Sequence, residues 1–315
     1  MNVSIEPTGR WLRRYTKFVA ASTLFLIYAG AMVTSTGSGL AVPDWPLSYG
    51  MLMPPMVGGI FYEHGHRMIA TAVGMLVVIQ AIWLQMRERK RFLRVLGWIS
   101  LAAVLVQGGL GGLTVILLLP KAVSISHAAL AEIFLCINVA IAFFASRSYE
   151  SFQSRRGEAA NHRVITRVLV AAVFIQVLLG ALMRHLGAGL AIPDYPLSFG
   201  RIIPPLDTLE ITSNFLHRMG AIGVLILVVM TGFKIARDAN PSMMRLFRIL
   251  AGLVAIQITL GAFTVWSGKN DIITSFHVMT GAATLATTLL LALTASVLGA
   301  KESSRGHIRA REVTA

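Results

Sequence analysis

An internal repeat with a period of 150 residues restricts the fold of this chain more than any other feature of its sequence. The segment GSGLAVPDWPLSYG at 37–50 returns as GAGLAIPDYPLSFG at 187–200. Other residues keep the same spacing, namely Gly30 and Gly180, Gln107 and Gln257, and Thr114-Val115 and Thr264-Val265. Internal repeats of this size are typical of membrane proteins built from two similar halves. We therefore predict a duplicated structure.

Eight apolar runs separate the polar segments. The 315 residues are 55% hydrophobic and 13% charged, with a mean hydropathy of +0.70, whereas soluble domains carry about 25% charged residues. Each run is long enough to cross a hydrocarbon core of ~30 Å as a helix. The expected spans are 18–36, 62–86, 95–117, 121–145, 164–184, 211–233, 246–267 and 272–298. These runs predict an all-α membrane protein with eight transmembrane helices.

The repeat unit contains four spans, and an even number of spans gives both halves the same orientation. We expect two four-helix bundles that are parallel repeats, related by a pseudo-twofold axis along the membrane normal. The predicted parts are an N-terminal half at 1–145, a linker at 146–163, a C-terminal half at 164–299 and a basic tail at 300–315. We expect His162, in the linker, to be solvated and Cys136, the single cysteine, to be a packing residue.

The basic residues predict the topology. The formal charge is +14, and 22 of the 28 Lys and Arg fall in five clusters, before residue 18, in 87–94, in 146–167, in 234–248 and after residue 300. These clusters occupy every second loop, as the excess of positive charge in cytoplasmic loops requires. Both termini are therefore expected on the cytoplasmic side of the cell inner or plasma membrane. The charge indicates contact with anionic lipid, and no nucleic acid partner is expected.

Four histidines in even-numbered spans also follow the repeat. His66 and His127 in the first half correspond to His217 and His277 in the second. Two facing imidazoles inside an apolar helix bundle are a common way to bind a heme iron from both sides. The alternative is that each is a hydrogen-bonded packing residue. Zinc is disfavoured because it needs three or four convergent ligands at one site, and each half offers too few.

The two halves differ beside these histidines. Glu63 lies one helical turn before His66, whereas the residue at the same spacing before His217 is Asn214. A carboxylate at one site only suggests that proton chemistry occurs in the first half, and the alternative is that Glu63 caps the start of its helix. Arg67 directly follows His66, where it would bind a heme propionate or extend to the lipid headgroups.

Arg218 follows His217 and has the same two interpretations. The repeated PDWP and PDYP loops are also ambiguous. Proline on both sides of an Asp-aromatic pair prevents helix formation. The aromatic residues suit either the headgroup interface or the rim of a porphyrin pocket.

Taken together, these residues resemble the heme A synthase family over nearly the whole chain. The resemblance is carried by the loop at 37–50, Glu63-x-x-His66-Arg67, His127, the loop at 187–200, His217-Arg218 and His277. It implies an oxidoreductase of heme biosynthesis that converts the C8 methyl of heme O into a formyl group for cytochrome oxidase assembly. Some family members carry a cysteine pair in the first of these loops, where this chain has none.

The resemblance also implies roles for individual residues. All four histidines would be heme iron ligands, with His217 and His277 holding a permanent heme b and the first half taking substrate heme O. Glu63, together with His66 and His127, would carry out catalysis. Expected partners are heme O synthase, terminal-oxidase assembly factors, membrane lipid and further copies of the chain, the oligomeric state being left open.

Two other function classes are weighed against this one. An electron-transferring b-type cytochrome would also contain two bis-histidine hemes, but it has no need of a carboxylate at one site only. A transporter built from parallel repeats would have broken helices near the membrane midplane. The polar residues of this chain cluster instead at the ends of the spans.

Overall fold

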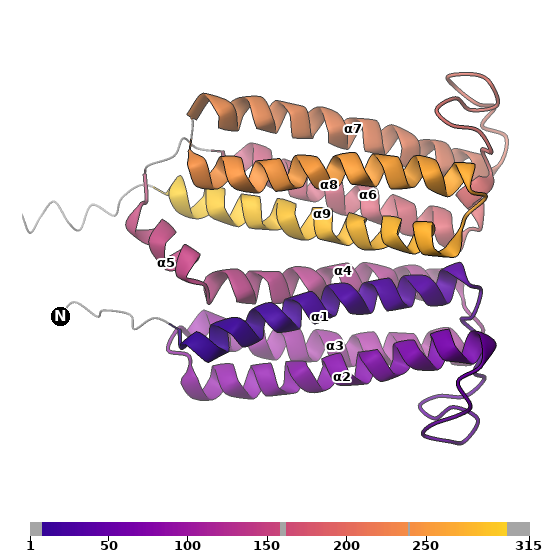
Figure 1. The fold of residues 1–315 in the computed structure, drawn as a ribbon, viewed down its shortest axis with the longest axis horizontal. Helices are drawn as coiled ribbons and strands as arrows, with labels where there is room; N and C mark the ends of the chain where they lie inside the picture. The colour runs from indigo at the N-terminus through magenta and orange to yellow at the C-terminus, as the bar shows by residue number, and fades with distance from the viewer. Residues whose placement is uncertain (1–7, 158–161, 239, 301–315) are drawn as a thin grey trace, which may run out of the picture.

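The computed structural model describes residues 8–157, 162–238 and 240–300, and these form one elongated body of long helices (Figure 1). Its membrane-length helices are α1 (Arg10–Ser35), α2 (Gly58–Arg87), α3 (Arg91–Ile116), α4 (Lys121–Phe144), α6 (Arg163–His185), α7 (Leu209–Asp238), α8 (Pro241–Trp266) and α9 (Asp271–Leu298). All eight are long and apolar enough to cross a membrane. The predicted all-α class with eight such helices is confirmed.

The helices gather in two groups of four (Figure 1). In the first group each of α1 to α4 packs against two others, as α1 with α2, α2 with α3, α3 with α4 and α4 with α1. Helices α6 to α9 make the same closed ring of contacts. We call these groups the N-terminal bundle and the C-terminal bundle. Because each ring is closed, each bundle has its own interior.

The two bundles meet along α1, α4, α6 and α9. The seam contains Leu135 and Val139 of α4 and Ala282 of α9, all buried, with small and aliphatic residues of α1 packed against them. One end of the seam is polar: the Arg184 guanidinium donates to the carbonyl oxygen of Ala31 at 2.6 Å and to the Ser35 hydroxyl at 2.9 Å. This hydrogen bonding between α6 and α1 fixes the bundles against each other.

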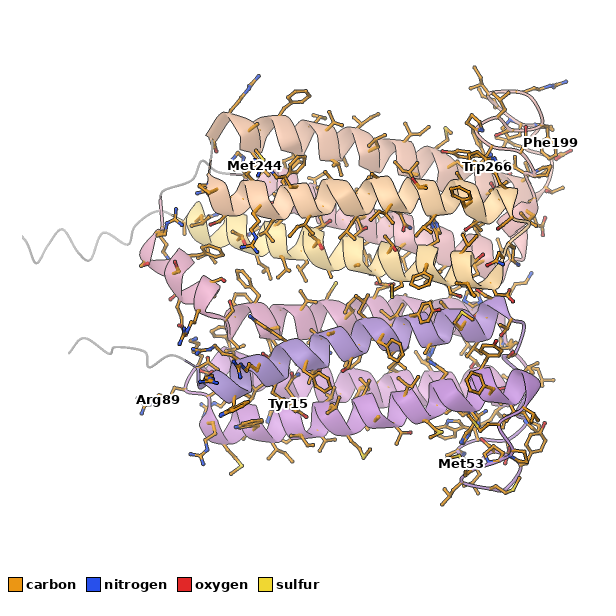
Figure 2. All side chains as sticks on the ribbon, in the orientation of Figure 1. Tyr15, Met53, Arg89, Phe199, Met244 and Trp266 are labelled. Carbon is orange, nitrogen blue, oxygen red and sulfur yellow. The ribbon has the colours of Figure 1, made fainter. Side chains whose placement is uncertain are left out.

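Different segments of the chain lie at the two ends of the body. The segments 37–57 and 187–208 emerge at one end, which we call the loop end, on opposite sides of the molecule (Figure 1). Met53 and Phe199 lie in these two loops, and Arg89 lies at the opposite end, which we call the linker end (Figure 2). Gly37 and Gly187 begin the loops with positive φ angles of 68° and 74°, a conformation that favours glycine and lets each helix stop abruptly.

The start of α1 and the structure of the linker differ from the sequence-based expectations. Helix α1 begins at Arg10 rather than near residue 18, because Leu12 and Thr16 are buried and the basic segment continues the helix without a break. The linker contains a short helix, α5 (Arg147–Ser154). Its Tyr149 is 8% exposed and packs edge-on against Phe144 at 5.1 Å, so this part of the linker is docked on α4.

The expectation of a solvated His162 was wrong. Its side chain is buried and forms an ion-pair contact with Asp238 at the end of α7. Because this contact joins the start of α6 to the end of α7, the histidine is part of the C-terminal bundle. Cys136 is partly buried and packs against the core of that bundle, as a packing residue would. The tail at 301–315 lies outside the described residues.

Candidate functional site

Each of the four histidines lies against a glycine on the preceding membrane-length helix. A Cβ atom on Gly30 or Gly180 would be 3.0 Å from Cε1 of His66 or His217, respectively. The corresponding distances from Gly111 to His127 and from Gly261 to His277 would be 3.2 and 3.1 Å. Only a residue without a side chain leaves room for the imidazole there. We call this arrangement, a histidine ring packed against a glycine of the preceding helix, a glycine seat. It occurs four times, once for each predicted ligand.

The two histidines of the C-terminal bundle face each other. The ring centres of His217 and His277 are 6.5 Å apart and the ring planes cross at 81°. An iron bound to one nitrogen of each ring needs about 2 Å for each bond and about 1 Å from each nitrogen to its ring centre, or about 6 Å in total. The observed separation thus fits a metal held between the rings. His66 and His127 are also close enough to interact electrostatically.

Glutamine residues support three of the four histidines, two through their side chains and one through its backbone oxygen. In the N-terminal bundle, Gln107 donates through Nε2 to the backbone oxygen of His127 at 3.0 Å. In the C-terminal bundle, Nδ1 of His277 lies 3.1 Å from the backbone oxygen of Gln257. Gln176 contacts Nδ1 of His217 at 3.1 Å through its Nε2. Such contacts orient a ligating imidazole and set which of its nitrogens is free for a metal.

The arginines that follow His66 and His217 are turned toward the loops. In the N-terminal half, Nη1 of Arg67 donates to the carbonyl oxygens of Asp44 at 2.7 Å and Leu47 at 2.9 Å. Arg218 repeats this arrangement with the carbonyl oxygens of Asp194 and Leu197 at 2.8 and 2.9 Å. Each guanidinium therefore holds the PDWP or PDYP turn of its own half. Neither of the two predicted partners, propionate or lipid, is needed to explain this placement.

Glu63 has two partners. Its side chain is 3% exposed, and it accepts hydrogen bonds from the backbone N–H of Val42 at 2.8 Å and from Arg67 at 2.7 Å. Asn214 occupies the same place in the other half and instead donates to the carbonyl oxygen of Ala188 at 2.8 Å. Glu63 makes no cap hydrogen bond to the start of α2, which begins after Val57. The carboxylate thus joins the loop, the arginine and the helix that carries His66.

The loop of the N-terminal half reaches over the bundle. A Cβ on Gly112 of α3 would be 2.7 Å from the indole ring of Trp45, so this ring lies directly on the helix at the residue next to Gly111, which seats His127. Other loop residues project away from the bundle, with Leu52 85% and Met53 60% exposed (Figure 2).

An aspartate stabilises the tip of each loop. The carboxylate of Asp44 accepts from the backbone N–H groups of Tyr49 and Gly50 at 2.6 and 2.8 Å. These bonds, the one from Gly50 foremost, hold the pKa of Asp44 below its usual value. Because the folded pKa is depressed, this contribution to stability is present above the ordinary pKa and is lost as the pH falls through the lowered value. Asp194 has the same contacts with Phe199 and Gly200.

The fold and the site together define a class of protein: a multi-pass helical membrane protein with a seated pair of imidazoles in each of two bundles. Comparison with known sequences gives the family. The chain belongs to the COX15-CtaA family of cytochrome oxidase assembly proteins, whose sequence model matches residues 56–290.

Curated relatives carry a more specific name. The protein named heme A synthase from Symbiobacterium thermophilum is 31% identical over 261 residues, which cover 80% of this chain and 84% of the relative. The heme A synthase of Shouchella clausii is 30% identical over 69% of this chain and 74% of its own length. That of Brucella anthropi is 28% identical over 83% of this chain and 86% of its own length. The predicted resemblance to the heme A synthase family is confirmed.

The glycine seats were missed by sequence reasoning, although one signal was present. Gly30 and Gly180 were noticed only as markers of the repeat, and Gly111 and Gly261 have the same spacing of 150 residues. Repeated glycines next to repeated histidines indicate a close approach of backbone to ring. Gln176 gave no such signal, because its counterpart in the first half is Leu26 and the repeat is broken there.

Enlarging one seat is expected to displace its histidine. Gly180→Val places branched carbon atoms where the His217 ring now lies, so we expect loss of heme from the C-terminal bundle and a decrease of about 1–3 kcal/mol in the free energy of unfolding. Gly223→Val on α7 is the matched control, since a Cβ there has no atom within 4 Å. Heme absorbance per protein and thermal unfolding measure both effects. Equal heme content in the two variants would contradict the seat.

Proposed function

We propose that this chain is an oxidoreductase that converts heme O into heme A. In each of two hydroxylations the C8 methyl of heme O would gain one oxygen atom and lose two electrons to an oxidant outside the chain, and loss of water from the resulting gem-diol would leave a formyl group. The single observation that carries the proposal is the pair of seated histidines in each bundle, with a buried carboxylate beside one pair only, in a member of this family. The relatives named heme A synthase support it. The electron-carrier alternative has no support among them.

The two bundles would bind different hemes and have different functions. In the C-terminal bundle, His217 and His277 would hold a heme b, and this group would supply electron transfer. In the N-terminal bundle, His66 and His127 would hold or flank the substrate heme O. The separation of 6.5 Å between the C-terminal rings and the four glycine seats support this assignment.

Glu63 would move the proton that methyl oxidation releases. Its place one turn from His66 and its contact with Arg67 put a carboxylate at the rim of the substrate bundle. Arg67 and Arg218 would serve the heme sites by holding the two loops closed over the bundle mouths. Trp45 would then form part of the rim that excludes water from the substrate.

The activity is tested by coexpressing the chain with a source of heme O and identifying the extracted hemes by mass spectrometry. The proposed enzyme yields the hydroxylated and formyl products, with heme b bound in addition. Heme b alone, with heme O left unchanged, would contradict the proposal. We also propose that heme O synthase delivers the substrate, that terminal-oxidase assembly factors receive the product, and that copies of the chain associate within the membrane.

We propose that the linker end and both termini face the cytoplasm and that the loop end lies outside the inner or plasma membrane. In a Cys136→Ala background, Ser151→Cys on α5 and Leu52→Cys in the first loop place single thiols at opposite ends of the body, at exposed positions. An impermeant thiol reagent added to intact cells is expected to label position 52 and to label position 151 only after lysis. Labelling of both positions in intact cells would contradict this topology.

A further inference from the structure

His66 on α2 and His217 on α7 correspond to each other by the repeat, but their side chains have different hydrogen-bond partners in the two bundles. In the C-terminal bundle, Nε2 of Gln176 on α6 contacts both Nδ1 of His217 at 3.1 Å and its backbone oxygen at 2.8 Å. In the N-terminal bundle, Nδ1 of His66 is buried and has no hydrogen-bond partner among the described residues. The His217 imidazole therefore contacts a side chain of a neighbouring helix through Nδ1, whereas the His66 imidazole has no such contact.

A glycine makes room for the glutamine. A Cβ on Gly220 of α7 would lie 2.1 Å from Oε1 of Gln176, a distance that no side chain could occupy. Gly220 follows His217 by three residues and so lies on the same face of α7, one turn further along. In its present position the carboxamide occupies space that a side chain at position 220 would need, so a larger residue there would force Gln176 to move. Gln176 and Gly220 thus form one unit.

The first half replaces both members of this unit. The repeat spacing that aligns Gly30 with Gly180 places Leu26 opposite Gln176, and the spacing that aligns His66 with His217 places Ile69 opposite Gly220. Leu26 and Ile69 pack against the apolar core of the N-terminal bundle. Two aliphatic side chains therefore stand at the positions that the carboxamide and the glycine hold in the other half. The exchange conserves packing and removes the hydrogen bond.

The second histidine of each bundle differs in the same direction: Nδ1 of His277 lies 3.1 Å from the backbone oxygen of Gln257, whereas Nδ1 of His127 is buried and has no hydrogen-bond partner among the described residues. Nε2 of Gln107 lies 3.4 Å from Nε2 of His127, and Nε2 of Gln257 lies 3.5 Å from Nε2 of His277. These two glutamines are themselves related by the repeat. The exchange of side chains is thus on the side of each site formed by α1 and α2, or by α6 and α7, since Gln107 and Gln257 are the same residue type.

We propose that Gln176, seated against Gly220, is a positioning residue that makes His217 a permanent heme ligand, and that Leu26 and Ile69 leave His66 as an exchangeable one. A ligating imidazole is oriented by donating its second ring N–H to an acceptor, so with Nε2 of His217 on the iron the Gln176 carboxamide would turn its Oε1 toward Nδ1–H. Loss of such a partner typically weakens metal binding 10–100-fold. Without a hydrogen-bond partner at Nδ1, the His66 imidazole would rotate away from a bound heme more readily. The N-terminal bundle would therefore admit substrate and release product. This inference rests on the proposed function, in which the halves hold a substrate heme and a resident heme.

The test exchanges the two units. Gln176→Leu/Gly220→Ile gives the C-terminal bundle the aliphatic pair that the other bundle already contains, and Leu26→Gln/Ile69→Gly does the reverse. The full-length protein is loaded with heme b, and its transfer to excess apomyoglobin is followed by absorbance. The rate for each bundle is measured in a background that lacks the other site, with His66→Ala for the C-terminal bundle and His217→Ala for the N-terminal bundle.

We expect Gln176→Leu/Gly220→Ile to accelerate heme loss from the C-terminal bundle about 10–100-fold and Leu26→Gln/Ile69→Gly to slow it from the N-terminal bundle by a similar factor. The midpoint potential of the heme retained in the first variant should also shift, which a purely structural role of Gln176 would not produce. Thermal unfolding shows that both variants are folded. Gln107→Leu and Gln257→Leu, each outside this unit, are the controls, and both should leave the C-terminal bundle with the slower heme loss.

The experiment distinguishes a failure of this inference from a failure of the proposed function. Heme dissociation is measured without turnover, so rates that shift as expected support the positioning role even in a protein that forms no heme A. Formation of heme A together with dissociation rates within threefold of the unmodified protein would overturn the positioning role alone. An equal change in both bundles from either exchange would also overturn it.

Discussion

Glu63→Gln is expected to lower the rate of heme O oxidation by roughly 10²–10⁴ while the heme content stays unchanged. The glutamine side chain has nearly the same shape, but its single oxygen can accept only one of the two hydrogen bonds that the carboxylate receives, at Oε2 from the Val42 N–H and at Oε1 from Arg67. It also lacks an ionisable carboxylate that can accept and release a proton. Turnover with added heme O, measured by product mass, gives the rate.

A loop-holding role for Glu63 predicts a different result. If the carboxylate served only to join Val42 and Arg67, Glu63→Gln would lower the rate only as far as the loss of one of these hydrogen bonds displaces the loop. Thiol labelling at Leu52→Cys reports whether the loop keeps its position in the variant. A turnover within threefold of the unmodified protein would overturn the assignment of proton transfer to Glu63.

Asn214→Asp is the partner experiment, because Asn214 holds the other loop at the matching place. The new carboxylate lies beside Arg218 and near His217, so we expect a change in the potential of the C-terminal heme. No second active site is expected, since the C-terminal bundle would hold its heme permanently. Heme A formation in Asn214→Asp that survives Glu63→Gln would contradict the division of labour between the bundles.

His217→Ala and His277→Ala are expected to remove the resident heme b, whereas His66→Ala is expected mainly to abolish turnover. In the C-terminal bundle the two rings are held 6.5 Å apart, and loss of either leaves the metal with one ligand. In the N-terminal bundle the proposed occupant is a substrate that enters and leaves. Heme b per protein, measured in each purified variant, separates the two classes. Equal heme loss from all three would show that the halves are not functionally distinct.

The sequence determined the broad plan of the protein. Helix number followed from the lengths of the apolar runs, since the hydrocarbon thickness sets the length of a spanning helix. The four histidines followed from the repeat, because equal spacing along two copies places residues at equal depth. Local neighbours also followed: Glu63 does lie beside Arg67 and one turn from His66. Linker residues were misjudged, since α5 and the burial of His162 depend on surfaces supplied by other helices.

Only the tertiary structure decided what each side chain touches across helices. Spacing along one helix gives the face on which a residue lies, but not the rotation of that helix or the residue opposite. The contact of Arg67 with the loop carbonyls, the seat of His66 on Gly30 and the fit of Gln176 against Gly220 are all contacts between different segments. They arise from the packing of whole helices at close distance. The sequence therefore determined which residues are candidates for the two sites, and the packing decided how the surroundings of these residues differ.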